Sequence, residues 1–113
     1  MNPEPNFAKY ENGLFPIVIQ DHKTREVLTQ AYVDREAWAL ILQTRMTHTY
    51  SRERKGVFKK GATSGHTQLI MKITLDCDCD CALLEVRRAG AACHIDGHDS
   101  CFHNPVPLET SVP

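Results

Sequence analysis

The interpretation of this chain starts from one stretch near its middle, Leu75-Asp76-Cys77-Asp78-Cys79-Asp80-Cys81-Ala82-Leu83-Leu84. Three carboxylates and three thiols alternate in this stretch without interruption. In an extended strand successive side chains point to opposite faces, so the aspartates would share one face and the cysteines the other. Carboxylate oxygens suit a hard cation such as magnesium, whereas thiolates suit zinc. An extended run would therefore offer ligands to two unlike metals on its two sides.

Both halves of this run also have an ordinary interpretation. A solvated acidic face is the alternative for Asp76, Asp78 and Asp80. Clustered carboxylates repel one another, however, and destabilise the fold unless a cation neutralises them. Aspartate is also poorly suited to strands, so the metal-binding interpretation is favoured. Cys79 and Cys81 are explained equally well as small, buried apolar residues.

Length and composition limit the class of protein. A chain of 113 residues forms one domain with a modest core. Its formal net charge of −1, with 42% apolar and 24% charged residues, gives no electrostatic attraction to nucleic acid or to membranes. No stretch approaches the roughly 18–20 apolar residues of a transmembrane helix, and residues 1–5 lack the features of a signal peptide. We therefore expect a cytoplasmic protein, whose five cysteines bind metal or react rather than form disulfides.

The periodicity of the sequence predicts an α+β, β-rich fold. One helix is predicted at about residues 34–44, with Asp34 as its N-cap and strong helix formers after it. Four of its apolar residues fall at helical spacing and are expected to face the core: Ala37, Trp38, Ile41 and Leu42. Alternating or β-branched segments predict strands at residues 14–20, 25–33, 46–52, 57–58, 67–75 and 82–88.

Two details of these strands and the domain limits can also be predicted. Pro16 confines the first strand to a sheet edge or occupies its first residues. The strand at 67–75 is expected to present one apolar face made of Leu69, Met71, Ile73 and Leu75. Residues 13–104 are expected to form the single domain, between a flexible N-terminal arm at residues 1–12 and a loose C-terminal tail at residues 105–113.

A second chemistry-bearing stretch runs from Cys93 to Cys101. Two cysteines and two histidines surround a glycine turn, as in a metal-ligand loop, but the usual close pairing of zinc-finger cysteines is absent. A third ligand must come from elsewhere, and Cys77 is the obvious donor. Three protein ligands and an open position are typical of catalytic zinc. His94 is then a candidate base or proton shuttle, with a solvent-exposed loop histidine as the alternative; His98 and His103 are interpreted as ordinary loop histidines.

The third stretch is the loop from Ser51 to His66, which is rich in cations, hydroxyls and glycines. Such a mixture is typical of phosphate recognition, because free backbone N–H groups and positive charges both favour anions. Taken alone the signal is weak, since a run of charges is usually a solvated face. The groups concerned are Ser51, Arg52, Arg54, Lys55, Lys59, Lys60 and the segment Gly61-Ala62-Thr63-Ser64-Gly65.

Taken together, the three stretches resemble one family, phosphoribosyl-AMP cyclohydrolase of histidine biosynthesis. The matching elements occur in the family's order and cover roughly residues 13–103. They are Ala31-Tyr32, Ser51-Arg52, Lys60-Gly61, Thr63-Ser64-Gly65-His66, Gln68, Asp76-Cys77-Asp78 with Asp80, Leu83-Leu84, Ala92-Cys93-His94 and Ser100-Cys101-Phe102.

The resemblance implies a hydrolase that opens the adenine ring of phosphoribosyl-AMP between N1 and C6. It implies a mixed, buckled β-pseudobarrel with one main helix, assembled as an intertwined homodimer. Zinc would be held by Cys77 of one subunit with Cys93 and Cys101 of the other. Magnesium, which would help to fix the substrate, would be held by Asp76, Asp78 and Asp80.

The same resemblance assigns roles at the substrate. His94 is the implied general base for the zinc-bound water that attacks C6. The implied substrate-binding residues come from the phosphate-like loop: Arg52, Lys60, Thr63, Ser64, Gly65 and His66.

Some residues depart from the family pattern. The step from Cys93 to Cys101 is one residue longer than usual, and Ala62 stands where the family usually has a glutamate. Phe58 replaces a common tryptophan, and Cys79 and Cys81 are additional thiols. These departures leave two alternatives open: a divergent paralogue acting on another purine-like ring, or a non-catalytic zinc-binding module.

Overall fold

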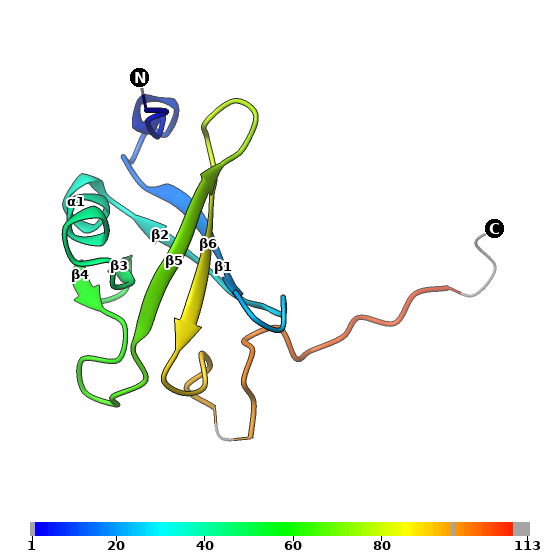
Figure 1. The fold of residues 1–113 in the computed structure, drawn as a ribbon. Helices are drawn as coiled ribbons and strands as arrows, with labels where there is room; N and C mark the ends of the chain where they lie inside the picture. Colours follow the sequence, from blue (N-terminus) through cyan, green and yellow to red (C-terminus); the bar gives the residue numbers. More distant parts are fainter. Residues whose placement is uncertain (1, 96, 110–113) are drawn as a thin grey trace.

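A four-stranded mixed sheet forms the centre of the computed structural model, which describes residues 2–95 and 97–109 (Figure 1). The strands lie in the order β2-β1-β6-β5. β1 pairs in parallel with β6, and the other two pairings are antiparallel. The bounds are β1 (Phe15–Asp21), β2 (Val27–Val33), β5 (Gln68–Leu75) and β6 (Ala82–Arg88).

Strand β1 supplies the middle of the hydrophobic core. Phe15, Ile17 and Ile19 alternate with outward-facing residues and are almost completely buried. Pro16 lies at the second position of the strand, before the pairing with β6 begins at Ile17. Its missing N–H therefore leaves no gap in the β1–β6 ladder, and the expectation that Pro16 occupies the first residues of its strand is confirmed.

The helix α1 (Arg35–Thr44) lies where the sequence predicts it. Its N-cap is Asp34, whose Oδ1 accepts a hydrogen bond of 2.8 Å from the backbone N–H of Ala37, and this satisfies one of the free donors of the first turn. Ala37 and Ile41 are buried in the core, and Trp38 packs beside it. Leu42 is 59% exposed, so the expectation that it faces the core is wrong.

Strands β3 (His48–Ser51) and β4 (Gly56–Lys59) form a separate two-stranded sheet. Within the described residues an isolated bridge between Met46 and Leu69 links this region to β5, but β3 and β4 pair as strands with each other alone. The prediction of a β-rich α+β fold with one main helix and mixed sheets is thus confirmed. The implied pseudobarrel is not found in the single chain, because its two sheets do not close into a barrel.

A bulge divides the face of β5. Ile70 pairs with Val86 and Lys72 pairs with Glu85, which leaves Met71 as an extra residue. One extra residue exchanges the two faces of a strand, so Gln68 and Ile70 are buried before the bulge, whereas Ile73 and Leu75 pack against the core after it. The predicted common face of Leu69, Met71, Ile73 and Leu75 is therefore wrong, and Met71 is exposed.

The N-terminal segment packs against the body of the protein. A short 3-10 helix η1 (Phe7–Lys9) buries Phe7, whose ring centroid lies 5.3 Å from that of Phe15. The division of the chain into residues 1–12, 13–104 and 105–113 stays a prediction. None of the helices within residues 2–95 and 97–109 is long and apolar enough to cross a membrane.

A buried ion pair closes the end of the sheet where β6 finishes. Asp21 Oδ2 accepts a hydrogen bond of 2.8 Å from Arg88 Nε, while its Oδ1 accepts from the backbone N–H groups of Lys23 and Thr24. These contacts, led by the Thr24 N–H and then the Arg88 guanidinium, hold the pKa of Asp21 well below its usual range. The ionised carboxylate therefore stabilises both the β1–β2 turn and the β1–β6 pair.

We predict that Asp21→Asn lowers the free energy of unfolding at pH 7 by about 1.5–3 kcal/mol, since the amide keeps the turn but loses the charged partner of Arg88. Because the folded-state pKa is depressed, this contribution is complete above about pH 4 and is lost as pH falls toward the folded-state pKa. Urea unfolding at several pH values measures it. Glu26→Gln is the control, since the exposed Glu26 lies 3.8 Å from Arg88; an equal loss in the two variants would contradict the assignment.

Candidate functional site

The alternating Asp/Cys run forms a loop and not a strand. β5 ends at Leu75 and β6 begins at Ala82, and the backbone N–H of Asp76 donates to the carbonyl of Cys81 at 2.9 Å. Cys79 lies in the left-handed region, with a φ of 59°, which an extended strand does not allow. The expected split into an aspartate face and a cysteine face is therefore wrong.

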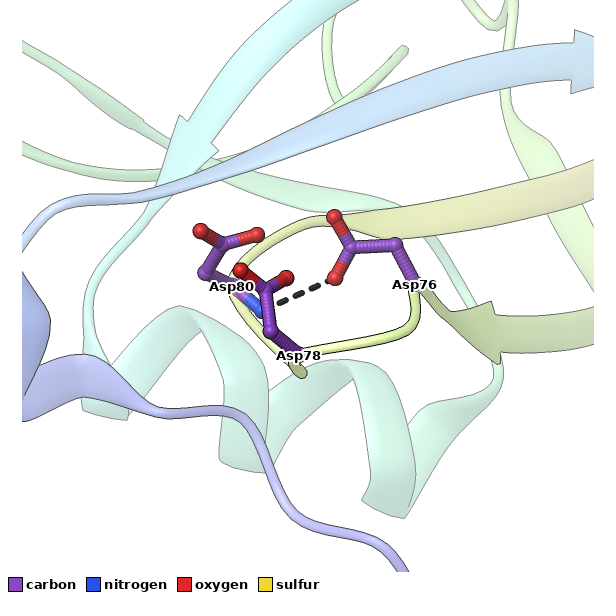
Figure 2. Close-up of side chains that lie close together, drawn as sticks. All are labelled: Asp76, Asp78 and Asp80. Carbon is purple, nitrogen blue, oxygen red and sulfur yellow. Dashed lines mark hydrogen bonds between the residues drawn. The ribbon is translucent and has the colours of Figure 1, made fainter.

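The Asp76 side chain organises this loop. Its Oδ1 accepts hydrogen bonds from the backbone N–H groups of Asp80, at 2.9 Å, and Cys81, at 3.2 Å. Aspartate side chains compete in this way with ladder pairing, which explains why the strand stops at this residue. The bond to Asp80 draws the far side of the loop toward Asp76 (Figure 2).

The three carboxylates lie close together because the chain turns at this loop, and not because they alternate along a strand. One oxygen from each of Asp76, Asp78 and Asp80 lies within 4.8 Å of the others, and the side chains gather on one side of the loop (Figure 2). Oxygen-only donors at this spacing fit a hard divalent cation. Within the described residues this is the one group of three or more acidic, histidine or cysteine side chains that meets such a spacing.

The N-terminal segment contributes a further charged group that local sequence patterns do not indicate. Lys9 Nζ forms ion pairs with Asp80 and, at 3.3 Å, with Asp78. These contacts raise the pKa of Lys9 above its usual range, so its ammonium stays charged. Nothing in the local spacing of Lys9 signals this role, because the contact joins residues about 70 positions apart.

The additional thiols of the loop differ from the zinc candidate Cys77. Cys77 is exposed, whereas Cys79 and Cys81 are half-buried. Burial, followed by the nearby charges of Asp76 and Asp80, raises the pKa of the Cys81 thiol. Cys81 lines a hollow of about 350 Å³ on the outer face of the sheet, with Val18 and Leu83.

The other two zinc candidates lie at the opposite end of the sheet. Cys77 sits in the loop that enters β6, while Cys93 and Cys101 follow the exit of β6 at Arg88 (Figure 1). The seven residues of β6 span roughly 20 Å at the usual rise per residue. Cys93 is buried and Cys101 is exposed. The structure of one chain therefore does not bring the three cysteines together.

The histidines at the cysteine end of the sheet differ in their contacts. His94, the candidate base, is exposed. His103 Nε2 lies 3.6 Å from the Cys93 sulfur, and its ring stacks on that of His98 with centroids 3.8 Å apart. The interpretation of His103 as an ordinary loop histidine missed this contact. Its position two residues after Cys101 was the available signal.

The glycine-rich loop lies at the same end as Cys93. Gly90 faces the ring of His66, since a Cβ at Gly90 would come within 2.5 Å of that ring. Lys60 is anchored through its backbone N–H to the carbonyl of Thr47 at 2.9 Å, and Gly65 N–H bonds to the carbonyl of Gly61 at 2.9 Å. The remaining predicted residues of the loop, Thr63 and Ser64, are exposed.

Arg52 is separate from that loop. Its guanidinium lies over the Tyr32 ring, 4.5 Å from the centroid, and both residues line an open groove of about 560 Å³. Tyr32 pairs with Pro16, next to the row where Ile17 pairs with Ala82. Arg52 therefore lies toward the end of the sheet that carries the aspartates, while Lys60 to His66 lie toward the cysteine end.

A small α+β domain that collects carboxylates on one loop and thiols and histidines on another belongs to the class of candidate metal-dependent enzymes. The sequence model of phosphoribosyl-AMP cyclohydrolase matches residues 29–103, a span that contains every predicted site residue. The chain belongs to the phosphoribosyl-AMP cyclohydrolase family, and the resemblance predicted from its motifs is confirmed.

Curated relatives agree with this membership. The chain is 52% identical to the phosphoribosyl-AMP cyclohydrolase of Methanosarcina acetivorans over 84% of this chain and 78% of the relative. It is 50% identical to that of Archaeoglobus fulgidus over 82% and 85%. It also matches the histidine biosynthesis bifunctional protein HisIE of Thermus thermophilus, at 48% identity over 82% of this chain and 43% of that protein.

We predict that Gly61→Ala destabilises the glycine-rich loop more than Gly65→Ala does. Both glycines have positive φ, 84° and 79°, so either alanine is strained by about 1–2 kcal/mol. At Gly61, however, the new Cβ would also lie 2.4 Å from the backbone carbon of His66, whereas the space beside Gly65 is open. Thermal unfolding of the two variants compares them, and equal losses of stability would contradict the packing of this loop.

Proposed function

We propose that this enzyme opens the adenine ring of phosphoribosyl-AMP between N1 and C6, as a step of histidine biosynthesis. The observation that carries the proposal is the family match over residues 29–103, within which three carboxylates converge to 4.8 Å. A relative named as a histidine biosynthesis protein supports the pathway.

Two metals are proposed to take part. Magnesium would be held by Asp76, Asp78 and Asp80, whose oxygen-only donors fit it. Zinc would be held by the thiolates of Cys77, Cys93 and Cys101. When bound, zinc would supply a water molecule whose pKa is lowered to about 7, which makes a hydrolytic nucleophile available at neutral pH.

The zinc site is proposed to lie between the subunits of a homodimer. Cys77 enters β6 and Cys93 follows its exit, roughly 20 Å away at the usual rise of a strand, so one ion cannot reach both within one chain. Two chains related by a two-fold axis can place the Cys77 end of one beside the Cys93 end of the other, and this forms two equal sites. The same arrangement would bring Arg52 of one subunit toward Lys60 to His66 of its partner.

The protein side chains have separate proposed tasks. His94 would act as general base and accept a proton from the attacking water. Positive charge, hydroxyls and free N–H groups would hold the substrate phosphate; they come from Arg52, Lys60, Thr63, Ser64, Gly65 and His66. The cytoplasm is the proposed location, since all five cysteines, each within the described residues, are free thiols.

A divergent paralogue that acts on another purine-like ring is the second candidate. The longer step from Cys93 to Cys101 and the absence of the usual glutamate at Ala62 favour it. A non-catalytic zinc-binding module is the third, and it would turn over neither substrate. Purified protein supplied with zinc and magnesium separates the first candidate from the other two, because phosphoribosyl-AMP is consumed under the first proposal alone.

We predict that Cys77→Ser and Cys93→Ser are each inactive but regain activity when mixed and allowed to exchange subunits. A shared site leaves one intact zinc site in each mixed dimer, so about a quarter of the wild-type activity and zinc content returns. The matched control mixes Cys93→Ser with Cys101→Ser, in which both sites of the mixed dimer stay damaged. Recovery in the control, or none in the test mixture, would overturn the shared site.

We predict that His94→Ala lowers kcat by about 10²–10⁴-fold, the usual loss when a general base is removed. His103→Ala is the informative comparison, because His103 contacts Cys93. His103→Ala should reduce the zinc content of the protein and leave the pH dependence of kcat unchanged. A general base produces the rise of kcat with pH on the acidic side of the profile. If His103→Ala removes this rise and His94→Ala keeps it, then His94 is not the base.

A further inference from the structure

The ammonium group of Lys9 contacts the acidic cluster. Lys9 Nζ contacts Oδ2 of both Asp78 and Asp80, two of the three carboxylates that converge in the loop. Lys9 precedes the matched span, residues 29–103, so the contact adds a group from outside that span to the candidate site.

The position of Lys9 is fixed by its neighbours and not by its own charge alone. The backbone N–H of Asn6 donates to the carbonyl of Cys79 at 2.8 Å, and the Tyr10 hydroxyl donates to the carbonyl of Asp80. Between them Phe7 is buried at 5% exposure. These contacts fasten the segment around Lys9 to the same loop that carries the aspartates, and they give the ammonium a high local concentration there.

We propose that Lys9 is a tethered competitor for the divalent cation of the aspartate cluster: its ammonium neutralises part of the cluster when no metal is bound and must leave when one binds. The proposal rests on the proposed function, in which the three aspartates hold magnesium.

The geometry determines the direction of the effect. A cation that used oxygens of all three aspartates would take the oxygens now shared with Lys9, and its two positive charges would repel the ammonium. One positive charge offsets only part of the repulsion among three carboxylates, so a divalent cation can still displace it. Lys9 would thus weaken metal binding, whereas a merely supporting lysine would strengthen it by holding the carboxylates in place.

The test is isothermal titration of the full-length protein with Mg²⁺ and with Mn²⁺. Lys9→Met removes the competitor and should tighten binding by about fivefold, a small effect because the ion pairs of Lys9 are exposed to solvent and screened by it. Lys9→Arg keeps the charge and should bind nearly as the wild type does. Lys23→Met makes the same change of net charge at an exposed residue of the β1–β2 turn, and it controls for long-range electrostatics. Lys9→Gln repeats the test if Lys9→Met does not fold.

The proposal is supported if Lys9→Met binds the metal more tightly than the wild type and Lys23→Met does not. Asp80→Asn should abolish the binding. Unchanged or weaker binding in Lys9→Met overturns it, as does the absence of metal binding in every variant. Turnover of phosphoribosyl-AMP is measured separately. A protein without turnover that still shows the predicted binding difference would refute the proposed reaction and leave the competition intact.

Discussion

The parallel pairing of β1 with β6 determines where the candidate metal-binding loops lie. It places two buried strands side by side in the centre of the sheet, with Ile17 beside Ala82 and Asp21 beside Val86. The loops that carry the carboxylates and the candidate zinc thiols then lie before and after β6. The carboxylates of the loop 76–81 lie at the entry of β6, and the thiols and histidines that follow Arg88 lie at its exit. A single chain therefore keeps Cys77 apart from Cys93 and Cys101, and the proposed dimer is the arrangement that would bring them together.

Electrostatic repulsion is the second constraint, because three carboxylates share one short loop. The structure offsets this repulsion with two kinds of donor: backbone N–H groups directed at Asp76 and the ammonium of Lys9 beside Asp78 and Asp80. The first kind belongs to the loop and shapes it. The second belongs to a distant segment held by Phe7, so the charge state of the site and the packing of the N-terminal segment are physically linked.

Local patterns predicted much of the fold and some of the site. The N-cap at Asp34 fixed the start of α1, and alternation located the strands to within a few residues, because both signals depend on neighbouring residues. Alternation failed at Met71, where a bulge exchanges the faces, and in the Asp/Cys run, where the Asp76 side chain closes a loop. The roles of Lys9 and His103 depend on contacts that only the folded chain creates. The convergence of the three aspartates was predicted correctly, but from strand geometry that the loop does not have.

We propose that the thiols at the two ends of the sheet serve one metal across a subunit interface, while the aspartates serve another. An anomalous-scattering map of a crystal grown with zinc and magnesium, recorded at the zinc absorption edge, tests it most directly. We expect a zinc peak that contacts Cys77 of one subunit and both Cys93 and Cys101 of its partner, with none at the aspartate cluster. A zinc peak held within one chain by Cys77, Cys79 and Cys81, or one seated on the three aspartates, would contradict it.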